Sequence, residues 1–322
     1  MIECRIPAPA VCFYEAMHAC SLASKWGRAL ELIAKLHVDG IDAFPRDYGY
    51  GYNHQEQCGG MMDCFKHTVL VSLLEEMVQD SSPFTYIDTH AARGIYDLES
   101  QDVARILLQR DQDGVHRLSD LALERPNLHL HPSINRYLSI LHCFNDGPFV
   151  RYYLGSPGLA VKWLRPQDNA LLFELAEPVH SELQRNLRLL DPEGQLAIEA
   201  LQENSFKHLG ASPPKFCGRG LVLMDPPAEP WDQVVAWSLQ VLKSLQQGWP
   251  GCCVVYWYPC LGVQESSSLY HRVQDLKLDD VLVVEMSADT RLFGSSGVCI
   301  VNPPDGLAEK LKAVLLLSVL LD

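Results

Sequence analysis

The chain has 322 residues, of which 48% are hydrophobic and 20% charged, a composition typical of a folded globular protein and not of a disordered one. Its formal net charge of −14 argues against a protein that coats nucleic acid unspecifically, although a local basic face could still meet RNA. The densest apolar run, at 314–320, is too short to span a bilayer, so we expect no membrane segment. The N-terminus shows no basic region followed by an apolar block, so no secretory signal is evident.

Residues 11–45 indicate a pair of helices, Tyr14–Ser24 and Trp26–Asp39, with Gly40 placed to end the second. The segment CFYEAMHACSLASKWGRALELIAKLHVDGIDAFP resembles one pentatricopeptide repeat, a unit that normally stacks on neighbouring copies. No second copy is found in the sequence. We therefore expect residues 1–47 to form a helical hairpin, which is either an RNA-binding or partner surface or an ordinary pair of helices.

From residue 48 onward, helical and strand patterns alternate. The sequence predicts an amphipathic helix over 62–80, a strand over 84–90 and a mostly helical insertion over about 100–148. Further apolar strands are predicted at NALLFELAE (169–177), LVLMDPP (221–227), CCVVYWYP (252–259), DVLVVEMS (280–287) and GVCIVNPP (297–304). Helical patterns occupy 231–247, 264–275 and 306–320. This alternation predicts an α/β domain over 48–322 with a doubly wound, largely parallel sheet.

The eleven cysteines include no CxxC pair, so the sequence predicts neither a zinc ribbon nor a thioredoxin-type motif. Cysteines such as Cys252 and Cys253 stand among apolar residues, which favours reduced thiols in an intracellular, reducing compartment. Cytoplasm and organelle are not distinguished. The histidines of LHLHP, His129 and His131, have no third ligand nearby in the sequence, so we expect no metal site.

The loop after the first strand, IDTHAARGIY, is the expected cofactor site, because open α/β sheets bind ligands outside the carboxyl ends of their strands. It contains only Gly94 and matches a diphosphate-binding GxGxxG pattern poorly. A cofactor without phosphates, such as S-adenosylmethionine, needs less close approach to the backbone. Glu174, after the next strand, is a candidate acceptor for ribose hydroxyls; alternatively it is an ordinary acid at the start of a helix.

The stretch LVLMDPPAEP ends a strand with Asp225, Pro226 and Pro227. One interpretation is a plain strand end, since proline cannot continue a ladder. The other is a pair of acceptors, the Asp225 carboxylate and the Pro226 carbonyl, that hold an exocyclic amine. This pair suits methyl transfer to an adenine amine, which needs orientation and stabilisation of its developing positive charge more than a strong base.

From Tyr52 onward the chain resembles the RlmJ family of 23S rRNA adenine-N6 methyltransferases, which have a Rossmann-like sheet. The segments that carry the resemblance occur in the family's order: YNHQEQCGGMMDCFKHTVL, FTYIDTHAARGIY, RYYLGSPGLA, LLFELAEP, GRGLVLMDPPAEP, VVYWYP and GSSGVCIVNPP. The resemblance implies S-adenosylmethionine as cofactor, large-subunit ribosomal RNA as partner, and Asp225, Pro226 and Pro227 as the catalytic motif. It implies cofactor contacts at Lys66, His67, His90, Ser156, Glu174, Asn204 and Ser205. It places Tyr52 and His54 near the substrate.

Several positions depart from the family pattern. Ala228 replaces an aromatic residue that would stack on the flipped base, and Tyr258 is a possible substitute. Ala92 and Arg93 replace glycines, Asn204–Ser205 replaces Asp-Gly, and histidines are missing from 56–63. Three interpretations remain open: an rRNA methyltransferase, a catalytically degenerate RNA-binding or ribosome-assembly factor, and a methyltransferase for DNA adenine or another amine. The target nucleotide and the oligomeric state are not given by the sequence.

Overall fold

The computed structural model describes His54, Leu269 and residues 58–99, 114–125, 130–210, 218–227, 231–260, 271–278, 280–286 and 295–314. The chain divides into two compact units, Met1–Tyr50 and Gly51–Asp322. The first unit, and with it the predicted hairpin of 1–47, lies outside the described residues, as do Tyr52 and Ala228. In the part that is described, no helix is both long and apolar enough to cross a membrane.

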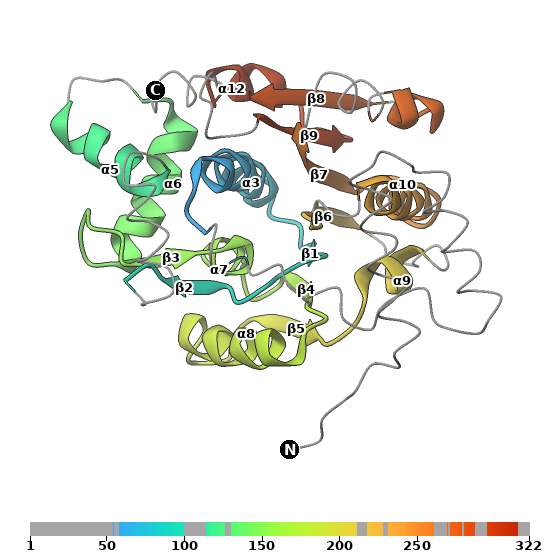
Figure 1. The fold of residues 1–322 in the computed structure, drawn as a ribbon. Coiled ribbons are helices and arrows are strands. Elements are labelled where there is room, and N and C mark those ends of the chain that lie inside the picture. The colour runs from blue at the N-terminus through green and yellow to red at the C-terminus, as the bar shows by residue number, and fades with distance from the viewer. Residues whose placement is uncertain are drawn as a thin grey trace, which may run out of the picture. The chain divides into compact units, whose positions relative to one another are not determined.

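The core of the second unit is a seven-stranded sheet in the order β5-β4-β1-β6-β7-β9-β8 (Figure 1). Its strands are β1 (Phe84–Asp88), β4 (Asn169–Phe173), β5 (Ala197–Leu201), β6 (Arg219–Met224), β7 (Cys253–Cys260), β8 (Val281–Met286) and β9 (Ser295–Val301). β5, β4, β1, β6 and β7 are parallel, whereas β9 pairs antiparallel with both β7 and β8. The predicted doubly wound, largely parallel sheet is therefore confirmed.

The strand order places a switch point at the centre of the sheet. From β1 the chain proceeds outward to β4 and β5, then returns to the other side of β1 to form β6 and β7. The carboxyl ends of β1 and β6 flank the position where the direction reverses, which is where open α/β sheets bind ligands. Residues 88–90 and 225–227 therefore meet at this edge.

Helices cover both faces of the sheet (Figure 1). One face carries α3 (Met61–Gln79), α7 (Ser156–Val161), α8 (Glu177–Leu190) and α12 (Leu307–Val314), and the other carries α9 (Ser205–Gly210) and α10 (Trp231–Gly248). Two clusters of buried apolar side chains correspond to these faces, the α3 cluster with Phe65 and Leu70 and the α10 cluster with Val241 and Leu245. Between them, the central strands β6 and β7 are buried on both sides.

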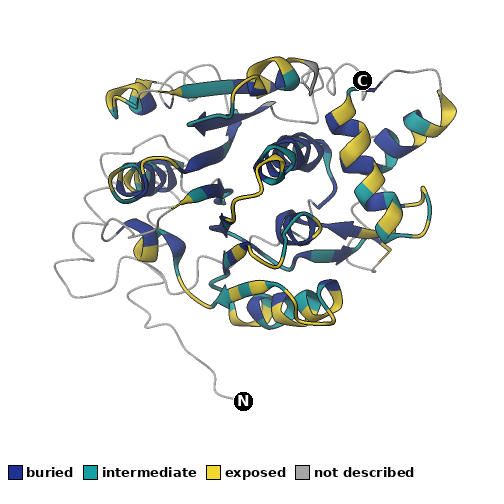
Figure 2. Cartoon of the chain, turned by 180° about the vertical axis from the view of Figure 1, so that it is seen from behind, coloured by how far each residue is buried: buried dark blue, intermediate teal, exposed yellow. Residues whose placement is uncertain are grey.

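The helix predicted over 62–80 is present as α3, but the prediction that it is amphipathic is wrong. Its buried residues follow one another without a break from Asp63 to Leu74, polar side chains included. In Figure 2 the helix is dark blue along most of its length. The reason is an outer layer: α6 (Pro132–Phe144) and α12 pack against α3 on sides that the sheet does not cover.

The insertion contains α5 (Val115–Glu124) and α6, and it leaves and rejoins the domain through a short antiparallel ribbon of β2 (Ile95–Asp97) and β3 (Tyr152–Leu154). The sequence did not predict this ribbon, because three residues are too few to show a period of two. It also did not predict β5, a half-exposed edge strand with little apolar character. The ribbon joins the insertion directly to the loops at the switch point.

Candidate active site

The loop that follows β1 is fixed between the two neighbouring strands. Thr89 N donates to Leu223 O on β6 at 3.0 Å, and Ala91 N donates to Phe173 O on β4 at 2.8 Å. Asp88, the last residue of β1, has no exposed surface and accepts hydrogen bonds from the Tyr86 hydroxyl at 3.0 Å and from His90 N at 3.2 Å. Burial raises the pKa of Asp88 to about 6, although these hydrogen bonds oppose the rise.

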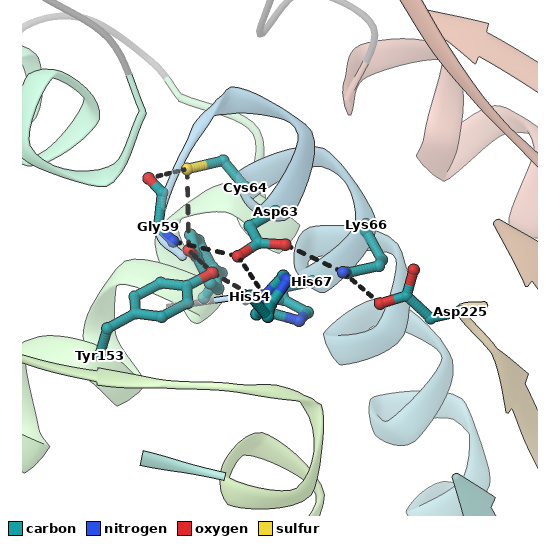
Figure 3. Close-up of polar contacts among 9 residues, drawn as sticks. His54, Gly59, Asp63, Cys64, Lys66, His67, Tyr153 and Asp225 are labelled. Carbon is teal, nitrogen blue, oxygen red and sulfur yellow. Dashed lines mark hydrogen bonds and ion pairs between the residues drawn. The ribbon is translucent and has the colours of Figure 1, made fainter. Parts of the chain in front are cut away.

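The carboxylate at the end of β6 is held by a buried lysine. Lys66 Nζ, on α3, forms an ion pair with Asp225 Oδ2, and it lies 2.9 Å from Asp63 Oδ1 (Figure 3). The side chains of Lys66 and Asp225 are 4% and 15% exposed. Burial alone would lower the pKa of Lys66, but the two carboxylates raise it above its ordinary value, so the ammonium stays charged. The structure thus brings two predicted residues, Lys66 and Asp225, into direct contact.

Asp63 is a site residue that the sequence did not reveal. It is buried on the first turn of α3, accepts a hydrogen bond from Gly59 N at 3.0 Å, and has Oδ2 3.2 Å from His54 Nε2 (Figure 3). Burial opposes its ionisation, yet Lys66 and His54 hold its pKa well below the ordinary range. The available signal was its spacing, since an acid three residues before Lys66 lies on the same side of a helix.

His67 follows Lys66 in the chain but contacts different partners. Its Nδ1 lies 2.6 Å from the hydroxyl of Tyr153 on β3, which in turn accepts a hydrogen bond from the hydroxyl of Tyr137 on α6 at 3.1 Å. Burial lowers the pKa of His67 to about 3, so the imidazole is neutral near pH 7. His67 therefore connects α3 with the insertion, whereas Lys66 turns toward β6.

Ser156 lies where the insertion returns to the sheet. It is the first residue of α7, it is buried, and its side chain opposes the rise in the pKa of Asp88. Here the backbones approach closely, since a Cβ on Gly158 would lie 2.7 Å from the carbonyl oxygen of Gly94. The turn at Ser156 thus packs directly against the loop that follows β1.

Glu174 follows β4 at the same edge of the sheet. Its Oε1 accepts a hydrogen bond from Ala176 N at 2.8 Å. Burial raises the pKa of Glu174 above its ordinary value, and the backbone N–H groups of Ala176 and Ala92 oppose the rise. The carboxylate therefore joins the loop after β1 to the start of α8.

His90, Asn204 and Ser205 form another part of this edge. The His90 ring lies 5.1 Å from the ring of Phe206 on α9, and burial lowers its pKa to about 4. Asn204 Oδ1 accepts a hydrogen bond from Lys207 N at 3.1 Å, which caps α9, and Ser205 is buried as the first residue of that helix. α9 thus brings both predicted residues to the side of the loop that carries His90.

Ala92 and Arg93 replace glycines in the loop after β1, and the loop accommodates them in different ways. Ala92 has φ +49°, a left-handed conformation that costs an L-residue energy. Arg93 directs its guanidinium to α8, where Nε lies 2.5 Å from Glu182 Oε2, and its carbonyl accepts a hydrogen bond from Asn186 Nδ2 at 2.8 Å. The Arg93 side chain therefore packs along α8.

Tyr258 is 3% exposed and belongs to the α10 cluster, and its hydroxyl donates to Glu285 Oε1 at 2.8 Å. Its neighbour Trp257 is half-buried, packs against the α3 cluster, and has its ring centroid 5.5 Å from Lys66 Nζ. Trp257, and not Tyr258, therefore lies beside the Lys66–Asp225 ion pair.

Among the residues that the structure describes, no three His, Cys, Asp or Glu side chains gather as metal ligands would. Parallel β1, β4 and β6, with polar side chains collected at their carboxyl ends, form the arrangement of an S-adenosylmethionine-dependent methyltransferase. The chain belongs to a particular family of this class. Residues 81–319 match the family model described as "Ribosomal RNA large subunit methyltransferase D, RlmJ".

Relatives support the same assignment. The chain is 30% identical over 272 residues to ribosomal RNA large subunit methyltransferase J of Haemophilus influenzae, covering 82% of this chain and 91% of the relative. It is 29% identical over 278 residues to the Escherichia coli protein of that name, with the same coverage. A crystal structure of a Legionella pneumophila protein superposes with a TM-score of 0.66 at 26% identity, covering 80% of this chain and 91% of the other.

Proposed function

We propose that this methyltransferase transfers the methyl group of S-adenosylmethionine to the N6 amine of an adenine in large-subunit ribosomal RNA. The observation that carries the proposal is the Lys66–Asp225 ion pair at the switch point. Lys66 engages one carboxylate oxygen, Oδ2, and so fixes the orientation of the group. The other oxygen, Oδ1, and the Pro226 carbonyl then accept the two hydrogens of the amine.

For methyl transfer the protein must orient the amine and stabilise the positive charge that develops on its nitrogen. The bound cofactor supplies an electrophilic methyl group on a sulfonium, whose departure leaves a neutral thioether. Asp225 and the Pro226 carbonyl direct the amine lone pair, and the negative carboxylate stabilises the positive charge that develops on nitrogen. Pro226 and Pro227 have no N–H, so the backbone at this point offers acceptors and no competing donors. Asp225 also accepts the proton that the methylated amine releases.

The residues at the neighbouring strand ends fit the cofactor by the chemistry of their groups. We assign Glu174 to the ribose hydroxyls, since the Ala176 N–H holds its carboxylate at the end of β4. We assign His90, Asn204 and Ser205 to the side of the cofactor's adenine, and Ser156 to the turn that faces the loop after β1. Lys66 and His67 contact Asp225 and Tyr153 here, so we assign them to positioning at the junction of cofactor and acceptor.

The experiment is transfer of labelled methyl groups to large-subunit ribosomal RNA that lacks this modification, followed by digestion and identification of the methylated nucleoside. The wild-type protein should produce N6-methyladenosine, and an equal amount of DNA should not compete. Asp225→Ala should abolish transfer while the circular dichroism spectrum and cofactor affinity are retained. A folded Asp225→Ala protein with normal activity would remove Asp225 from the mechanism.

The alternative that this experiment tests is a catalytically degenerate RNA-binding or ribosome-assembly factor with the same fold. Arg93 is one of the residues that suggested this alternative. Its side chain contacts Glu182 on α8 and points away from the loop after β1. A wild-type protein that binds both RNA and cofactor but transfers no methyl group would establish this alternative. We also propose an intracellular, reducing compartment, in keeping with the buried free thiols of Cys252, Cys253 and Cys299.

A further inference from the structure

The acceptor site contains a second carboxylate that the proposed chemistry does not use. Asp63 and Asp225 lie on either side of the Lys66 ammonium, which is 2.9 Å from Asp63 Oδ1 and forms an ion pair with Asp225 Oδ2 (Figure 3). Asp63 and Lys66 are each 4% exposed, so water screens their interaction weakly. A buried carboxylate is costly unless it is compensated, and here the compensation comes from Lys66, the Gly59 N–H and His54.

The charge of this cluster matters for the reaction. Methyl transfer moves a positive charge from the sulfonium to the amine nitrogen, and a net negative charge beside the amine favours this movement. Lys66 with Asp225 alone would be a neutral pair and would give the amine little stabilisation. Asp63 offsets the charge of Lys66, so the three ionised side chains together carry a net charge of −1.

We propose that Asp63 is a positioning residue for methyl transfer, which balances the charge of Lys66 and holds its ammonium against Asp225. The inference rests on the proposed transfer to an amine. It assigns Asp63 no contact with the substrate, because Lys66 lies between it and Asp225. It also gives a reason for a polar, charged cluster inside a helix that is otherwise packed into the core.

A purely structural role is the alternative. Asp63 is in the first turn of α3, where an acid favours the helix, and it accepts the hydrogen bond from Gly59 N. Asparagine separates the two roles, since its side-chain oxygen can still accept from Gly59 N while the charge is lost. Glu75→Gln is the matched control. Glu75 lies on the same helix as Asp63, but its carboxylate pairs with Arg136 on α6 and not with Lys66.

The test is the single-turnover rate of methyl transfer to large-subunit ribosomal RNA at saturating cofactor and RNA. Asp63→Asn should lower this rate on the order of tenfold to a hundredfold, as expected for loss of a unit charge about 6–12 Å from the amine at an effective dielectric constant of about 20. Dissociation constants for cofactor and RNA, and the thermal midpoint, should change little. Glu75→Gln should transfer at the wild-type rate.

A double-mutant cycle with Lys66→Met gives a readout that a structural role would not move. In the wild-type background this change removes the ammonium that orients Asp225 and leaves Asp63 and Asp225 without the cation between them, so its effect should be severe. In the Asp63→Asn background Lys66 and Asp225 form a neutral pair, and removing Lys66 restores a net charge of −1 beside the amine, so the effect on the rate should be much smaller or reversed. Such coupling, together with intact binding, would support the charge-balancing role.

The outcomes are distinguishable. An Asp63→Asn protein that transfers at the wild-type rate overturns the inference, and so does a loss of rate that only follows lost folding or lost cofactor binding. Equal effects of Lys66→Met in both backgrounds also overturn it. A wild-type protein that methylates no RNA overturns the proposed function itself, before any variant is compared.

Discussion

Trp257 and Tyr258 are neighbours on β7, and their rings lie on opposite faces of the sheet. Trp257 packs with the α3 cluster and beside Lys66, whereas Tyr258 lies in the α10 cluster with its hydroxyl on Glu285. Successive side chains of a strand alternate in this way, so only one of the two rings can lie near Asp225. The register of β6 and β7 agrees with this. Met224 pairs with Tyr256, so Asp225 and Trp257, which follow them, are adjacent.

Trp257 is therefore the aromatic residue whose loss should weaken substrate binding. Trp257→Leu should raise the KM for RNA about tenfold or more, because stacking of a base on an aromatic ring is worth roughly 1–3 kcal/mol. Trp257→Phe should recover most of the loss, and cofactor affinity should not change. The measurement is steady-state methyl transfer over a range of RNA concentrations. A rise in KM for folded Tyr258→Leu, with none for Trp257→Leu, would return the role to Tyr258.

Ala92→Gly should stabilise the protein. The left-handed φ of +49° costs an alanine about 1–2 kcal/mol, while glycine costs about 0.4–1 kcal/mol through the greater freedom of the unfolded chain. We expect a net gain of about 0.5–1 kcal/mol in the free energy of unfolding, measured with urea. Ala91→Gly is the control, since Ala91 is buried and lacks a positive φ, and it should destabilise. Equal losses for both variants would show that Ala92 is not strained.

Arg93→Ala should leave the affinity for S-adenosylmethionine unchanged. The Arg93 guanidinium pairs with Glu182, whose side chain is 37% exposed, so solvent screens the pair and its loss should lower the free energy of unfolding by less than about 1 kcal/mol. Calorimetric titration with the cofactor checks the affinity, with Glu174→Ala as the variant expected to lose binding. Tighter binding by Arg93→Ala would mean that Arg93 crowds the cofactor.

His67 should make the protein less stable as the pH falls. Its pKa is about 3 in the folded state and 6.5 as the ordinary value, so below pH 6.5 the unfolded chain takes up a proton that the folded protein does not. The contribution is complete above pH 6.5 and declines toward pH 3 by at most about 1.4 kcal/mol per pH unit. His67→Gln should thus lose less stability than the wild type between pH 7 and pH 5.

Denaturant unfolding at both pH values measures this difference. Asp88, whose pKa is raised to about 6, acts in the opposite direction, but it is present in both proteins and cancels from the comparison. His67→Gln also removes the contact with Tyr153, which lowers stability at every pH and leaves the slope unaffected. Parallel curves for the two proteins would show that His67 titrates normally.

The sheet and the acceptor motif were predictable because their signals are local. Short apolar runs that end in polar residues or proline mark parallel strands, and Asp225 with two prolines is a distinct strand end. The surroundings of the site were not predictable. Asp63 has the sequence features of an ordinary first-turn acid, and Asp225, the other carboxylate that contacts Lys66, is remote in the chain. β7 is buried on both faces, so its sequence shows no alternation that would assign Trp257 and Tyr258 to opposite sides.

The inner position of α3 also affects the order in which the protein can fold. The helix that carries Asp63 and Lys66 is covered by α12, through Leu307, Leu311 and an ion pair between Lys310 and Glu76 that spans 234 residues of chain. Contacts between such distant segments form slowly, because a long loop must close first. During synthesis α3 is made before α12, so the acceptor site is covered as in the folded protein only after the segment that contains α12 has been made.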